Sequence, residues 1–163
     1  MKTIGLLGGM SWESTELYYR LINEETKRLR GGLHSAPIVM VSVDFHEIER
    51  LQVRDDWDTS ASILSEQARR IESEGADLLL ICTNTMHKVA DQVATTIGIP
   101  LLHIADATAA RVKASGVRTV GLLGTRFTME QSFYTDRLEQ GGLRVLVPDE
   151  ADRALVHRVI YEE

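Results

Sequence analysis

Polar side chains gather in one loop of this chain, directly after an aliphatic run. Residues 76–81 are apolar, and Cys82-Thr83-Asn84-Thr85-Met86-His87 follows them. Hydroxyl and amide groups at the end of a buried strand either cap the next helix or contact a ligand above the sheet. Taken singly, Asn84 and Thr85 are better explained as helix caps. Cys82 reads as a small buried side chain on the face opposite Thr83, and His87 fits a solvent-facing or a site-facing position equally well.

Two further loops combine glycine with small polar residues. They are Gly8-Gly9-Met10-Ser11-Trp12-Glu13-Ser14 and Gly124-Thr125-Arg126-Phe127-Thr128-Met129, and each precedes a helix-like segment. Backbone N–H groups at a helix start can bind a carboxylate or a phosphate. The first of the two loops matches neither a dinucleotide-binding nor a P-loop motif. The alternative is that the glycines only allow a tight turn and that Arg126 is a solvated charge.

These two loops belong to an internal duplication. Residues 3–9 recur as residues 119–125 at a constant offset of 116 positions, and Tyr18 and Tyr134 keep the same register. Each copy reads as a short apolar strand that ends in a glycine turn and leads into a helix. We therefore expect two similar halves whose loops face each other across a site.

The elements that must position these loops alternate along the chain. Amphipathic stretches with the three-to-four residue spacing of a helix separate short apolar runs. This order predicts an α/β fold of two pseudo-symmetric, doubly wound parallel-sheet (Rossmann-like) halves, residues 1–104 and 105–163. The apolar runs are 4–7, 38–43, 76–81, 101–104, 120–123 and 145–147.

The second half is expected to be incomplete. The counterpart of Thr83 would fall at position 199, beyond the 163 residues of the chain, and residues 149–163 are helix-like with no stop signal. A truncated form of a longer protein is the interpretation that we favour.

Composition limits the classes of function. A net charge of −6 argues against nucleic acid or an anionic membrane surface as a partner, since both attract positive charge. One cysteine excludes a disulfide framework and a thiolate metal cluster, and we expect no bound metal. The first residues lead directly into a strand, and no apolar run reaches membrane-spanning length. A cytoplasmic location is predicted.

Four segments taken together resemble the aspartate/glutamate racemase family, closest to its L-aspartate/glutamate-specific bacterial members. The segments are Gly8-Gly9-Met10, Asn84-Thr85-Met86-His87, Leu102-His103-Ile104-Ala105-Asp106-Ala107-Thr108 and Gly121-Leu122-Leu123-Gly124-Thr125. The likeness runs from Met1 to Glu163. It implies a homodimer, a small dicarboxylic amino acid as substrate, and no pyridoxal phosphate, metal or nucleotide cofactor.

The resemblance also implies a two-base mechanism in which one proton leaves a face of the α-carbon and another arrives on the opposite face. The usual bases are two cysteines, but the alignment places Thr83 at the first of them. A hydroxyl is a much weaker base than a thiolate. The second cysteine would lie beyond Glu163, so the 163 residues alone are expected to be inactive.

Substrate contacts are implied at Met10, Asn84, Thr85 and Thr125. Arg50 and Gln52 are weaker candidates for reading the side-chain carboxylate, and their alternative is an exposed helix surface. Other activities stay open: hydantoin racemisation, maleate isomerisation, or an inactive protein that only binds small acids.

Overall fold

The computed structural model describes residues 1–162 and divides into two compact units, Met1–Leu102 and His103–Glu163. The boundary lies two residues before the one expected from the sequence. The elements of the first unit are β1 (Ile4–Gly8), α1 (Trp12–Arg30), β2 (Ile38–Ser42), α2 (Phe45–Val53), α3 (Trp57–Ser73), β3 (Leu78–Ile81), the 3-10 helix η1 (Thr85–Val89) and α4 (Ala90–Ala94).

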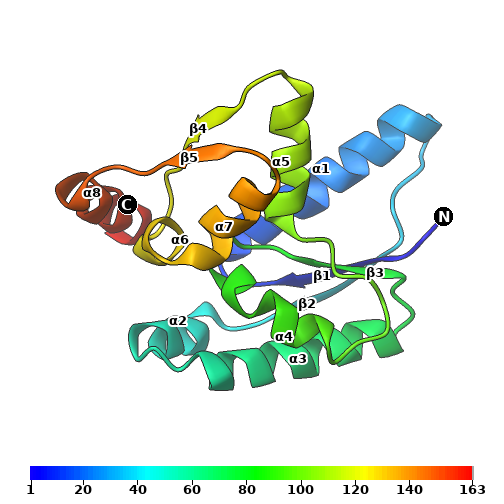
Figure 1. Cartoon of the computed structure of the whole chain (residues 1–163). Helices are drawn as coiled ribbons and strands as arrows, with labels where there is room; N and C mark the ends of the chain where they lie inside the picture. The colour runs from blue at the N-terminus through cyan, green and yellow to red at the C-terminus, as the bar shows by residue number, and fades with distance from the viewer. Residues whose placement is uncertain (163) are drawn as a thin grey trace. The chain divides into compact units, whose positions relative to one another are not determined.

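The first unit is built on a parallel sheet of order β2-β1-β3. Ile4 of β1 pairs with Ile38 of β2 and with Leu78 of β3, so the strands start together and run in the same direction. Figure 1 shows α1 on one face of this sheet and α3 with α4 on the other. Crossover helices on both faces are what parallel strands require, because each connection must return to the same end of the sheet.

The main core of this unit lies between the sheet and α3. The side chains of Ala61, Leu64, Ala68 and Ile71 recur every three or four residues along α3 and are fully or almost fully buried. This spacing places them on one face of the helix. Ile71 packs so closely over Gly5 of β1 that a side chain at position 5 would overlap it. The absence of a side chain in mid-strand therefore lets α3 approach the sheet.

The second unit contains α5 (Ile104–Ala114), β4 (Thr119–Gly121), α6 (Arg126–Glu130), α7 (Ser132–Gln140), β5 (Arg144–Leu146) and α8 (Glu150–Glu162). β4 and β5 are parallel, with Val120 opposite Val145. A separate core forms here from Ala105, Ala109, Tyr134, Leu138 and Leu143. The predicted α/β class and parallel strands are confirmed in both units.

One predicted strand is wrong. Residues 101–104 make only a single bridge, Leu79 with Leu101, and α5 already begins at Ile104. The preceding Pro100 has no N–H to donate to a ladder. His103 then caps α5, because its Nδ1 accepts from the N–H of Ala105 at 3.1 Å. A short apolar run does not distinguish a strand from the first turn of a buried helix.

Within residues 1–162 no helix is long and apolar enough to cross a membrane.

Candidate active site

The loops that follow the three strands of the first sheet lie together at its carboxyl edge, which means the side of the sheet where all three strands end. Leu7 pairs with Ile81 and Gly8 with Ser42, so β1, β2 and β3 end at the same level. The ladder of hydrogen bonds continues one residue further on both sides of β1. The N–H of Cys82 donates to the carbonyl of Leu7 at 2.9 Å, and the N–H of Val43 donates to the carbonyl of Gly8 at 3.0 Å. Ligands of open parallel sheets bind beyond this edge.

The loop after β1 is held by Thr15, a buried residue on the first turns of α1. The Thr15 hydroxyl accepts a hydrogen bond from the N–H of Gly9 at 2.9 Å and donates one to the carbonyl of Ser11 at 3.0 Å. The Gly9 N–H is therefore already bonded, which removes one donor from the predicted anion cradle. A side chain at Gly8 would overlap Thr15.

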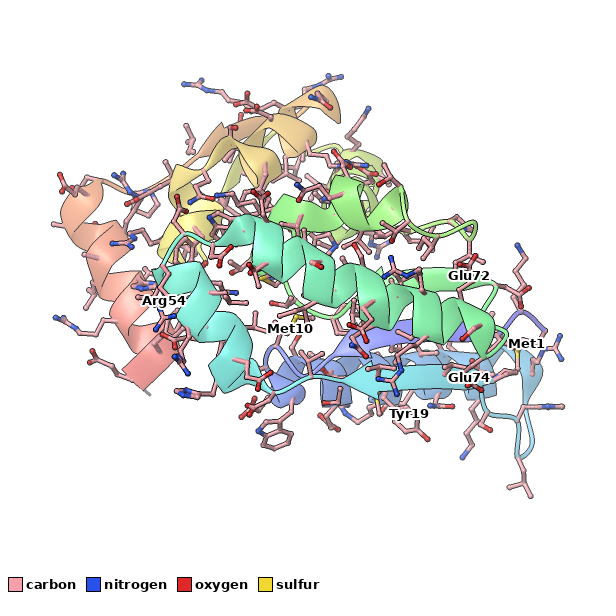
Figure 2. The ribbon with its side chains drawn as sticks, turned by 90° about the horizontal axis from the view of Figure 1, so that it is seen from below. Met1, Met10, Tyr19, Arg54, Glu72 and Glu74 are labelled. Carbon is pink, nitrogen blue, oxygen red and sulfur yellow. The ribbon has the colours of Figure 1, made fainter. Side chains whose placement is uncertain are left out.

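Met10 leaves this loop toward the interior. Its side chain is 3% exposed and belongs to the main core together with Ile48 and Met86 (Figure 2). A contact of Met10 with a substrate would therefore involve its backbone rather than its buried side chain. In the same figure Tyr19 points away from the outer face of α1.

Cys82 and Thr83 occupy different environments although they are adjacent. Cys82 is fully buried, and burial raises the pKa of its thiol to about 12. Thr83 is partly exposed just beyond the end of β3. Cys82 is thus a small core residue, as the alternation of the strand predicted, and Thr83 is the one that remains accessible.

The residues after Thr83 form the turn η1. Asn84 stands at its N-cap position but its side chain makes no capping hydrogen bond, so the capping role predicted for it is wrong. The Asn84 amide is exposed, whereas Thr85 and His87 are buried. The His87 Nδ1 lies 2.6 Å from the carbonyl oxygen of Thr83. A solvent-facing and a site-facing position of His87 fitted the sequence equally well, and the structure excludes the solvent-facing one.

α2 brings a buried amide to the same edge. The Nε2 of Gln52 donates to the sulfur of Met86 at 3.0 Å, and Gln52 is 3% exposed. The alternative that both residues lie on an exposed helix surface is therefore wrong for Gln52. It is correct for Arg50, which is exposed. Buried amides need hydrogen-bond partners, so Gln52 ties α2 to η1.

A cluster that the sequence did not indicate fixes the connection between α2 and α3. Lys88 of η1 places its Nζ 3.8 Å from an Asp55 oxygen and 3.9 Å from the centre of the Trp57 ring. The Trp57 indole N–H also donates to Asp55. Desolvation lowers the pKa of Lys88, and the nearby Asp55 charge acts in the opposite direction. No spacing rule links residues 55, 57 and 88.

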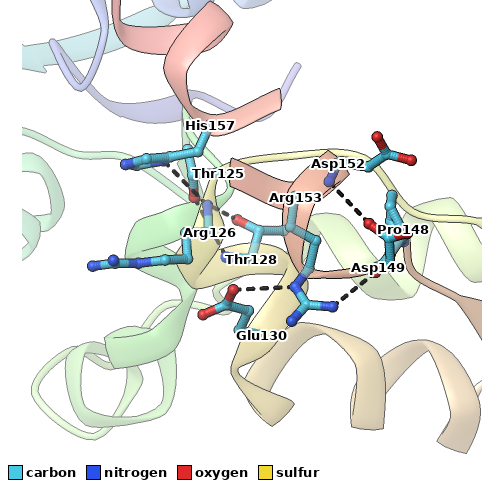
Figure 3. Close-up of polar contacts among 9 residues, drawn as sticks. All are labelled: Thr125, Arg126, Thr128, Glu130, Pro148, Asp149, Asp152, Arg153 and His157. Carbon is cyan, nitrogen blue, oxygen red and sulfur yellow. Dashed lines mark hydrogen bonds and ion pairs between the residues drawn. The ribbon is translucent and has the colours of Figure 1, made fainter. Parts of the chain in front are cut away.

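The loop after β4 has its own set of contacts. The Thr125 hydroxyl caps α6 by accepting from the N–H of Thr128 at 3.4 Å, and the two hydroxyls lie 3.2 Å apart. The N–H of the exposed Arg126 donates to Nδ1 of His157 on α8 at 3.2 Å (Figure 3). Desolvation and the Arg126 charge lower the pKa of His157, while Glu130 acts in the opposite direction. That this loop faces the first one stays a prediction.

Among the described residues no three or more His, Cys, Asp or Glu side chains are grouped as a metal ion would need. The groups at this end of the sheet are neutral donors and acceptors: the Thr83 hydroxyl and the Asn84 amide are at least partly exposed, whereas the Thr85 hydroxyl and the Gln52 amide are buried. Such groups bind carboxylates and stabilise charge that develops next to a carbonyl.

Several known proteins resemble this chain in sequence and in fold. The family model described as Asp/Glu/Hydantoin racemase matches residues 7–163. A solved structure from Yersinia pestis, provisionally described as an Asp/Glu racemase, is 57% identical with a TM-score of 0.93 and covers 100% of this chain. An aspartate racemase homologue from Pyrococcus horikoshii OT3 is 36% identical with a TM-score of 0.84, again over 100% of this chain.

The chain spans 71% of the length of each of these two structures. The curated broad specificity amino-acid racemase RacX of Bacillus subtilis (strain 168) is 24% identical over 157 residues, which are 93% of this chain and 67% of RacX. A family model that matches nearly the whole chain and a 57% identical relative of the same description show that this chain belongs to the Asp/Glu/Hydantoin racemase family.

Proposed function

We propose that this protein inverts the α-carbon of aspartate or glutamate by a cofactor-independent transfer of protons on two faces. The observation that carries the proposal is the polar turn Thr83-Asn84-Thr85 at the carboxyl end of β3, in a chain of this family whose Cys82 is turned into the core. Thr83 is the accessible group at the end of the strand and takes the place of a proton-transferring residue.

The remaining groups are assigned to the substrate. The Asn84 amide and the Thr85 hydroxyl contact the α-carboxylate, where negative charge increases as the α-proton leaves. Gln52 and the backbone of Met10 lie at the same edge of the sheet. Arg50 supplies a positive charge for the side-chain carboxylate, and a substrate contact of Thr125 stays a prediction from the sequence.

The two faces of the α-carbon are not served equally in this proposal. The Thr83 hydroxyl can donate a proton to a carbanion, which is a stronger base than an alkoxide, and the alkoxide then regains a proton from solvent. It removes an α-proton poorly, because a hydroxyl is hardly ionised near neutral pH. The opposite face needs a stronger base, and residues 1–163 supply no such thiol because Cys82 is buried with a pKa near 12. We therefore expect the α-proton of one enantiomer to exchange with solvent faster than that of the other.

The test is exchange of the α-proton in deuterated water, followed by proton NMR. L- and D-aspartate and L- and D-glutamate are incubated separately with the 163-residue polypeptide and with the product of the longest reading frame that contains it. The product of that reading frame should invert at least one enantiomer, measured by chiral chromatography, and Thr83→Val should remove the inversion while Thr83→Ser keeps part of it. Unchanged inversion in Thr83→Val would reject the role of Thr83. Full exchange by the 163 residues alone would reject the need for a further base.

A second substrate class is favoured by the breadth of the family, whose description includes hydantoin racemases. RacX, in addition, is described as a racemase of broad specificity. The same exchange assay with a 5-substituted hydantoin separates the two readings. Exchange of the hydantoin without exchange of either amino acid would replace the proposed substrate and leave the two-face chemistry in place.

A further inference from the structure

The buried imidazole of His87 is bonded to the backbone of the residue to which we assign proton transfer. Its Nδ1 lies 2.6 Å from the carbonyl oxygen of Thr83, and the side chain is 3% exposed. A carbonyl oxygen only accepts hydrogen bonds, so Nδ1 must carry the proton. The contact therefore fixes the tautomer of His87 as well as its orientation.

The backbone of η1 explains why this contact exists. In an α-helix the N–H of His87 would bond the carbonyl four residues earlier, which is that of Thr83. Here it bonds the carbonyl of Asn84 instead, at 3.0 Å, as a 3-10 turn requires. The Thr83 carbonyl then lacks its helical partner, and the His87 side chain takes over as donor. Without the His87 imidazole, the partly buried carbonyl oxygen of Thr83 would lose this hydrogen bond.

Other residues of η1 anchor the turn at different points. Met86 contacts the amide of Gln52, and Lys88 contacts Asp55 and the Trp57 ring. These contacts hold η1 against α2 and α3, but neither is made to Thr83. The His87 contact differs from them because it ends on the Thr83 peptide itself.

We propose that His87 is a positioning residue, which holds the Thr83 peptide so that the hydroxyl keeps one orientation toward the substrate. This inference rests on the proposed function of Thr83. His87 acts through the backbone and exchanges no proton with the substrate. A small displacement of a proton-transferring group is enough to reduce a rate strongly, so fixing one peptide has a large catalytic effect.

Two substitutions separate the hydrogen bond from the volume of the ring. In His87→Asn the amide nitrogen is as many bonds from Cα as Nδ1 is, so the donor is kept while part of the ring is lost. In His87→Phe the volume is kept and the donor is lost. Val93→Ala is the control, because Val93 is buried in α4 and its truncation destabilises the same region without touching Thr83.

The first readout is NMR on the 163-residue polypeptide. In the unsubstituted chain, nitrogen-15 spectra should show His87 protonated at Nδ1, and three-bond couplings should show one side-chain rotamer for Thr83. His87→Asn and Val93→Ala should keep that rotamer, whereas His87→Phe should give averaged couplings. A single rotamer in His87→Phe, or an unprotonated Nδ1 in the unsubstituted chain, would overturn the proposal.

The second readout is turnover by the product of the longest reading frame. His87→Phe should lower kcat by about ten- to hundred-fold with KM within about threefold, and His87→Asn should recover most of kcat. Equal losses in the Asn and Phe variants, or a similar loss in Val93→Ala, would mean that His87 only stabilises the fold. An inactive Thr83→Val beside a fully active His87→Phe would reject the positioning role alone, whereas a fully active Thr83→Val would reject the proposed function itself.

Discussion

The reactivity of Cys82 tests which residue of β3 faces the interior. Burial raises the pKa of this thiol from 9.0 to about 12. At pH 8 such a thiol carries about one thousandth of the thiolate that an unperturbed one carries, and the thiolate is the species that reacts. Its complete burial slows the reaction further, because a reagent must wait for local opening. We therefore expect a native reaction at least about a thousand-fold slower than that of the unfolded chain.

The assay is the reaction of the folded protein with an aromatic disulfide reagent, followed by absorbance at several pH values and repeated in concentrated urea. The matched control is the double variant Cys82→Ser with Thr83→Cys, which moves the single thiol by one position to the partly exposed side. The thiol at position 83 should react far faster than the one at 82. Turnover of the longest reading frame product should be little affected by Cys82→Ser alone.

Native rates at positions 82 and 83 that agree within about tenfold, at matched stability, would contradict the burial of Cys82. Loss of turnover in a stable Cys82→Ser variant would refute it as well. Either result would mean that the strand is shifted by one residue and that the thiol, not the hydroxyl, faces the substrate.

Three further predictions follow from named contacts. Gly9 and Gly75 both have a positive φ, but of the two only Gly9 lies where an added side chain would meet backbone atoms. Gly9→Ala should therefore lower the free energy of unfolding in urea by about 1 to 3 kcal/mol more than Gly75→Ala does. Equal losses would contradict the close approach at Gly9. His157 accepts a hydrogen bond from the N–H of Arg126, and its pKa in the folded protein is below the ordinary value of 6.5. Between these two pKa values the unfolded chain binds more protons than the folded one, so the free energy of unfolding should fall as the pH drops. The fall, measured by urea unfolding at pH 8 and pH 5.5, should be smaller in His157→Phe, and an unchanged fall would argue against this titration. Thr83→Cys in the longest reading frame product should increase turnover of the poorly used enantiomer, because a thiolate is a better base than a hydroxyl. Chiral chromatography measures this turnover, and no change would argue against Thr83 as a proton-transferring residue.

The sequence predicted the framework of the first unit well, because its signals are local. Apolar runs that end in glycine or polar turns predicted β1, β2 and β3 to within a few residues. The three-to-four residue spacing of the amphipathic stretches predicted helices between them, and in α3 the buried residues Leu64, Ala68 and Ile71 have this spacing. The predicted strand at residues 101–104 is wrong because a four-residue run with three apolar residues fits a strand and a helix start equally well. Only the cap by His103 distinguishes the two, and it depends on a contact with Ala105.

The site was predicted less completely, because its details depend on contacts between distant residues. Gln52 reads as a surface residue until Met86, which lies 34 positions away, is brought beside it. Lys88 meets Asp55 and Trp57 only because η1 packs against the connection between α2 and α3. His87 could have been suggested by its distance of four positions from Thr83, but the 3-10 geometry that frees the Thr83 carbonyl is not encoded in any motif.

The packing of Thr15 against Gly8 and Gly9 constrains how this loop can change during evolution. A side chain at position 8 would overlap both the methyl group and the hydroxyl oxygen of Thr15, and a residue at 15 that lacks the hydroxyl leaves the buried N–H of Gly9 without its acceptor. A change at position 8 and the change at position 15 that makes room for it therefore depend on each other, which makes these two positions an epistatic unit. Mutant libraries that aim at a new substrate should leave this unit intact and vary the exposed positions around Arg50 and Asn84, where each replacement can be selected independently.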